Sequence, residues 1–135
     1  MKITIFRIAC VLLSIVAIAF AQTATDIQAK YEADLAANPR SSVTRFRLGE
    51  IYFEQRNFQL AANTFRQALN GDLQPKWVEV WSHIKLGNIF DATDQRQRAI
   101  NEYMQAQWTK DNTRGAQDDV AMYLEFPYPR VTEWD

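Results

Sequence analysis

The stretch LGEIYFEQRNFQLAANTFRQA, residues 48–68, decides the fold of this 135-residue chain. Displaced by 38 residues, it falls on LGNIFDATDQRQRAINEYMQA, residues 86–106. The two stretches share a Leu-Gly pair, two alanines and two aromatic positions, namely Leu48/Leu86, Gly49/Gly87, Tyr52/Phe90, Ala61/Ala99, Phe65/Tyr103 and Ala68/Ala106. Self-similarity at a fixed period of this length indicates that one supersecondary unit is repeated.

Each copy predicts two helices joined by a short polar turn. Large apolar residues recur with helical rather than alternating spacing on both sides of Gln55-Arg56-Asn57. We expect Asn70-Gly71 to end the second helix through a left-handed residue, and Thr93-Asp94 to cap the matching helix of the second copy. We also expect Gly49 and Gly87 to let the paired helices approach closely, while the shared aromatic residues fill the space where the helices diverge.

The pattern resembles the tetratricopeptide repeat, whose signature spreads Leu-Gly, aromatic and alanine positions over about 34 residues. Residues 42–75 and 80–113 match it as two full repeats, and residues 22–41 resemble the end of a preceding partial repeat. The residues between the full repeats are expected to form an extra helical turn near 74–78. The chain departs from the signature at five positions, which are Arg45, Leu73, His83, Arg96 and Asp111.

The resemblance implies an all-α fold, a short α-solenoid of antiparallel helical hairpins over residues 22–125. A capping helix over 113–125 is expected to cover the last apolar face, as the ends of such arrays require. Residues 126–135, the C-terminal tail, are rich in aromatic residues and proline. Docking of this tail on the body, binding to another copy and disorder are the three alternatives for it.

The resemblance further implies a non-enzymatic adaptor or scaffold that binds a protein or peptide segment in a concave groove. The first helix of each hairpin lines that groove in the family. The matching positions here, with the contribution of the capping helix, are Phe46, Glu50, Phe53, Glu54, Trp81, Ile84, Asn88, Asp91, Asp118 and Met122. A self-associating structural element is the alternative function, because two full repeats bury a limited core.

The groove positions combine aromatic and acidic side chains, which favours a basic or apolar partner segment. Phe53 and Trp81 are the expected anchors, since large aromatic residues carry much of the binding energy at interfaces. The alternative is that Phe46, Ile84 and Trp81 pack between neighbouring first helices. Asn88 has no surrounding cluster of basic residues, so a site for a terminal carboxylate is not favoured.

Trp77 and Trp81 stand one helical turn apart, so they share a helix face. They form either an exposed aromatic ridge or a pair folded back onto Leu69 and Leu73. The second arrangement is favoured, because a large exposed apolar patch promotes aggregation.

Residues 1–21 predict a secretory signal peptide. Lys2 and Arg7 precede an uncharged stretch over 8–20, and Ala19-Phe20-Ala21 has the small residues of a cleavage site. That stretch spans about 20 Å as a helix, less than the roughly 30 Å hydrocarbon core of a bilayer. We therefore expect cleavage and export to the periplasm or outside the cell, within a bacterial cell envelope, with an uncleaved N-terminal anchor as the alternative.

The remaining composition argues against several other functions. A formal net charge of −1, or −3 without the leader, gives no general reason to bind nucleic acid or an anionic membrane. The chain has a single histidine, His83, and a single cysteine, Cys10, which are too few of the residues that usually bind zinc. We expect no catalytic residue, metal or cofactor, place His83 in the core or at a helix interface, and interpret Asp118-Asp119 as a solvated helix face.

Overall fold

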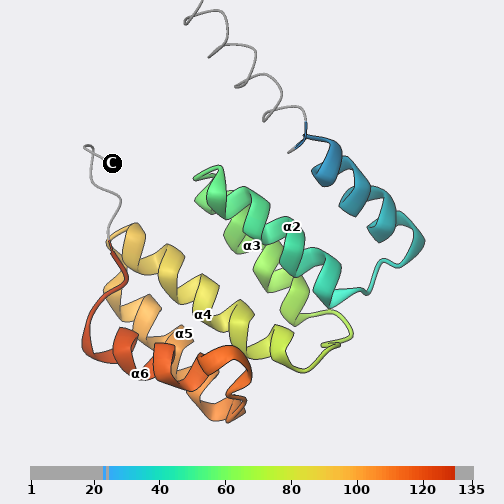
Figure 1. Ribbon diagram of the computed structural model, residues 1–135. Coiled ribbons are helices and arrows are strands. Elements are labelled where there is room, and N and C mark those ends of the chain that lie inside the picture. Colours follow the sequence, from blue (N-terminus) through green and yellow to red (C-terminus); the bar gives the residue numbers. More distant parts are fainter. Residues whose placement is uncertain (1–22, 24, 130–135) are drawn as a thin grey trace, which may run out of the picture.

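The computed structural model describes residue 23 and residues 25–129, and in this part the regular elements are all helices (Figure 1). A helix over residues 25–37 precedes five labelled elements and one short turn: α2 (Ser42–Glu54), α3 (Phe58–Leu69), α4 (Trp77–Ala92), α5 (Arg96–Thr109), the 3-10 turn η1 (Thr113–Gly115) and α6 (Ala116–Glu125). The predicted all-α class is confirmed. The predicted signal peptide over 1–21 lies outside the described residues.

From α2 onward, each helix packs against the next along the chain, and α4 also contacts both α2 and α6. The core runs through this stack, from Phe46 and Phe65 at the α2–α3 end to Tyr103 and Val120 at the α5–α6 end. Among the described helices, none combines the length and the apolar character needed to cross a membrane.

The second helical pair reproduces the first at the 38-residue displacement. Helix α3 begins at Phe58 and α5 at Arg96, while α2 ends at Glu54 and α4 at Ala92. The other two ends differ: α4 begins at Trp77, three residues before the position that matches the start of α2, and α5 ends at Thr109, two residues after the position that matches the end of α3. The extra turn predicted near 74–78 is present only in part: α4 gains the three residues from Trp77, and residues 74–76 form a loop instead.

The shared glycines make room for the shared aromatic rings. A methyl group on Gly49 would lie 2.8 Å from Cε1 of Phe65, and one on Gly87 would lie 2.2 Å from Cε1 of Tyr103. Both rings are fully buried. The close approach predicted between paired helices thus occurs between a glycine and a ring of the next helix, at the same place in both units.

The predicted left-handed stop at Asn70-Gly71 is wrong. Asn70 ends α3 with a φ of −96°, and the left-handed residue of this loop is Leu73, with a φ of 53°. Gly71 is required for a different reason, because a methyl group there would lie 2.3 Å from Oγ of Ser42 and 2.6 Å from the carbonyl oxygen of Arg40. The loop after α3 passes directly over the start of α2.

The predicted cap at Thr93-Asp94 is also wrong. The Thr93 hydroxyl donates to the carbonyl oxygen of Ile89 at 2.8 Å, so this side chain completes the end of α4 rather than the start of α5. Helix α5 starts after Gln95, whose side chain makes no capping hydrogen bond. In the matching turn of the first pair, Asn57 caps α3 through its side chain.

Arg96 fastens the capping helix to the rest of the fold. Its Nη1 lies 2.9 Å from Oδ2 of the buried Asp91, and its Nη2 donates to the carbonyl oxygens of Tyr123 and Leu124 at 2.8 and 2.9 Å. These carbonyls belong to the last turn of α6, where the helix has no internal donors left. An arginine at this departure from the repeat signature therefore joins α4, α5 and α6.

Candidate functional site: the face of α2, α4 and α6

A pocket of about 160 Å³ opens between α2 and α4, beside the turn that precedes α6. It is lined by Phe46, Glu50, Trp77, Trp81, Lys85 and Arg114. Three of the predicted groove residues, Phe46, Glu50 and Trp81, therefore meet at one place. We call the surface around this pocket, together with Phe53 and the exposed side of α6, the partner face.

The two tryptophans form one wall of this pocket. Both indoles are half-buried, so they are not an exposed ridge. The Trp77 ring lies edge-on to Phe46, with ring centres 5.3 Å apart, which places it against α2, whereas the prediction had placed the pair on Leu69 and Leu73. The indole Nε1 of Trp81 donates to the carbonyl oxygen of Thr113 at 3.0 Å, which ties this wall to η1.

Lys85 lies at the centre of the partner face. Its Nζ is 3.8 Å from Oε1 of Glu50 and 5.3 Å from the centre of the Phe53 ring. With Arg114, the pocket lining carries two cations and one carboxylate. The acidic character predicted for the groove is therefore not present in the pocket itself.

The other acidic residues predicted for the groove do not line this pocket. Glu54 and Asp118 are exposed, as is Met122. Asp119 is half-buried, so it is not part of a solvated face as predicted. Burial raises the pKa of its carboxyl group, the neighbouring Asp118 raises it further, and Lys85 opposes both effects.

Four predicted groove residues are buried in the fold. Phe46 and Ile84 are almost fully covered, which fits their interpretation as packing residues between first helices. Asn88 and Asp91 accept hydrogen bonds from the Tyr103 hydroxyl at 2.9 and 3.0 Å. Burial and the nearby carboxylate of Asp91 raise the pKa of Tyr103 far above its ordinary value, so this hydroxyl remains a donor.

The described part of the C-terminal tail lies against one end of the partner face. The backbone N–H of Tyr128 donates to Oδ2 of Asp91 at 2.8 Å. The Tyr128 ring packs against Phe53 and Tyr123, with ring centres 6.2 and 5.6 Å apart. Docking on the body is thus the arrangement of these residues, and the sequence could not show it, because the hydrogen bond comes from the backbone.

His83 occupies the predicted helix interface. Its Nδ1 lies 2.8 Å from Oε2 of Glu102, which joins α4 to α5, and both side chains are half-buried. In the part of the chain that the structure describes, no group of three or more His, Cys, Asp or Glu side chains is arranged to hold a metal ion.

No family model, curated protein or solved structure matches this chain.

Proposed function

We propose that this chain is a non-enzymatic adaptor or scaffold, built as a short α-solenoid of the tetratricopeptide type and exported to the cell envelope. It holds a segment of a partner protein on the partner face. The proposal includes cleavage of the leader in the periplasm or during secretion, with an uncleaved anchor as the alternative. Support for the fold comes from the common register of the two helical pairs and from the equivalent glycine–ring contacts at Gly49 and Gly87.

The observation that carries the binding proposal is the pocket shared by both helical pairs. Its walls are half-buried indoles, and half-buried aromatic side chains in a hollow are typical of the sites where interfaces gain most energy. An apolar side chain of the partner would enter beside Trp81, where Lys85 and Arg114 exclude a cation. Basic residues farther along the same segment would meet the exposed carboxylates of Glu54 and Asp118.

A peptide-display selection on the purified chain tests this proposal. The double variant Phe53→Ala/Trp81→Ala removes aromatic surface from the partner face, and Trp108→Ala is the matched control, because Trp108 is 62% exposed on α5. Selected peptides should bind the wild type and the control equally and bind the double variant about tenfold or more weakly, the loss of one hot-spot side chain. Equal binding to all three proteins, with helicity unchanged, would remove the partner face from the proposal.

The alternative function, a self-associating structural element, has one observation in its favour. Trp108 and Met104 are 62% and 38% exposed on the outer side of α5. Sedimentation velocity of the wild type and of Trp108→Ala across the micromolar range distinguishes the two functions. Self-association that Trp108→Ala abolishes supports the alternative, whereas a monomer at every concentration excludes it.

A further inference from the structure

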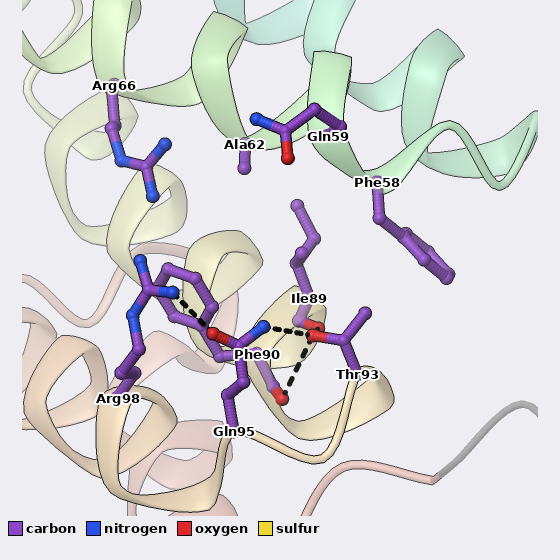
Figure 2. Close-up of a pocket in the computed structure, with 9 residues that line it drawn as sticks. All are labelled: Phe58, Gln59, Ala62, Arg66, Ile89, Phe90, Thr93, Gln95 and Arg98. Carbon is purple, nitrogen blue, oxygen red and sulfur yellow. Dashed lines mark hydrogen bonds between the residues drawn. The ribbon is translucent and has the colours of Figure 1, made fainter.

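A second pocket, of about 260 Å³, lies between α3, the end of α4 and the start of α5. Figure 2 shows Arg66 from α3 and Arg98 from α5 directed toward the ring of Phe90, which forms part of the pocket floor. None of the lining residues is acidic. We call this site the arginine pocket; it shares no lining residue with the pocket of the partner face.

The two guanidinium groups are close together and lack a carboxylate. Their Cζ atoms lie 5.7 Å (Arg66) and 4.0 Å (Arg98) from the centre of the Phe90 ring, so they are at most about 10 Å apart. Their described side-chain acceptors are neutral, namely Oδ1 of Asn63 and Oε1 of Gln95. Neither arginine forms an ion pair within the described residues. Two like charges at this separation favour an anion between them.

The start of α5 adds to this positive potential. Helices α2 and α3 are capped by the side chains of Ser41 and Asn57, whereas α5 has no side-chain cap and no acidic residue in its first turn. The Gln95 amide donates instead to Oγ1 of Thr93 at 2.9 Å. The positive end of the helix dipole therefore adds to the two arginines at the same opening.

We propose that the arginine pocket binds carboxylate side chains of this chain's own C-terminal segment, Glu133 and Asp135. Arginine is suited to carboxylates, because its planar group donates two parallel hydrogen bonds to one carboxylate. Two guanidinium groups at the observed separation have room to share one carboxylate or to hold two. The proposal does not depend on the function proposed for the partner face.

The segment starts close enough to reach the pocket. The Tyr128 ring is 6.2 Å from Phe53, and the Phe53 ring is 5.6 Å from Phe58, which lines the arginine pocket. The centres of the Tyr128 and Phe58 rings are therefore at most about 12 Å apart. Arg66 lies eight residues after Phe58 on α3, which is about 12 Å along the helix. The five Cα–Cα steps from Tyr128 to Glu133 span up to about 17 Å, and the seven steps to Asp135 span up to about 24 Å. The acidic end of the segment is therefore long enough to extend from Tyr128 past Phe58 to the arginines while the contacts of Tyr128 stay in place.

Trypsin cleavage after Arg130 under native conditions measures this docking, because docking shields the Arg130–Val131 bond. Release of residues 131–135 from the full chain is followed by mass spectrometry. We expect Arg66→Gln/Arg98→Gln to release the peptide about three to ten times faster than the wild type, the effect of losing two partly exposed ion pairs. The matched control is Arg56→Gln, since Arg56 is an exposed arginine in the turn between α2 and α3, and its rate should equal that of the wild type.

A second measurement leaves both arginines in place, so its result does not depend on whether the arginine substitutions disturb the fold. In Glu133→Gln/Asp135→Asn, the side-chain NMR signals of Arg66 and Arg98 should shift, while that of Arg96, paired with Asp91, should not. Unchanged signals of Arg66 and Arg98 would overturn the proposal, as would wild-type release from a folded Arg66→Gln/Arg98→Gln variant. Protection that increases with chain concentration would also overturn it, because the segment would then bind another copy.

Discussion

Replacing Gly87 by alanine tests the contact on which the second helical pair is built. The added methyl group would lie 2.2 Å from Cε1 of Tyr103, far inside contact distance. The ring cannot move freely, because its hydroxyl is bonded to Asn88 and Asp91 and its face stacks on Tyr123 at 5.4 Å. Overpacking of this kind costs about 3 kcal/mol, and disturbing the buried hydroxyl adds about 1 kcal/mol.

Alanine recovers about 1 kcal/mol as a better helix former than glycine. We therefore expect Gly87→Ala to lower the free energy of unfolding by about 3 kcal/mol. At Gly49 the clash is milder, at 2.8 Å, and the Phe65 ring has no hydroxyl to hold it, so Gly49→Ala should cost only about 1 kcal/mol.

Urea unfolding of the wild type and both variants, followed by circular dichroism, gives the comparison. Gly49→Ala serves as the matched variant, because it makes the same chemical change at the equivalent position. A Gly87→Ala variant as stable as the wild type, or one less affected than Gly49→Ala, would refute the reasoning.

Three further substitutions test other parts of the fold. Arg96→Met leaves the Asp91 carboxylate without its cation and should cost about 3 kcal/mol in urea unfolding, with faster hydrogen exchange in α6; unchanged exchange there would contradict the attachment of α6. Tyr128→Ala removes a ring from Phe53 and should lower the free energy of unfolding by about 1 kcal/mol, whereas an unchanged value would show that the tail contact adds no stability. Two backbone N–H groups lower the pKa of Asp72 below 3.8, so its stabilising effect is complete above that value and is lost as the pH falls through the lower, folded-state pKa. Asp72→Asn should weaken the pH dependence of urea unfolding in that acid range, and an unaltered pH profile would contradict the assignment.

The sequence predicted the helices because their determinants are periodic and local. The positions of Leu48, Tyr52 and Phe65 recur 38 residues later, and accordingly the end of α4 and the start of α5 match those of α2 and α3. The polar turn predicted at 55–57 is present, and the structure adds that Asn57 caps α3 through its own side chain, which acts within a few residues of itself.

The loop after α3 could not be predicted in the same way, because its shape is set by residues thirty positions away. Oγ of Ser42 donates to the carbonyl oxygen of Ala68 at 2.6 Å and accepts from the N–H of Leu73 at 2.9 Å. Oδ1 of Asp72 accepts from the N–H of Ser42 at 3.1 Å. A dipeptide such as Asn-Gly indicates a turn, but these contacts decide which residue of the loop becomes left-handed.

The candidate site was predictable as a set of helix positions but not as a distribution of charge. Trp81 and Glu50 meet as the resemblance implied, since their place in the repeat fixes which side of each helix they occupy. Arg114 reaches the same pocket from η1, which lies outside the repeat signature. A residue in an irregular turn has no periodicity that could have placed it there.

Asp91 explains how a partner could replace the tail without unfolding the protein. Its carboxylate receives Nη1 of Arg96, the hydroxyl of Tyr103 and the backbone N–H of Tyr128. Only the last of these donors belongs to the tail, so release of the tail leaves the buried charge with its cation and one hydroxyl. A buried carboxylate is costly only when it loses its compensating partners. A partner segment that covers Phe53 and offers one donor to Asp91 would therefore exchange for the tail at a small cost, and the helical body would keep its own contacts.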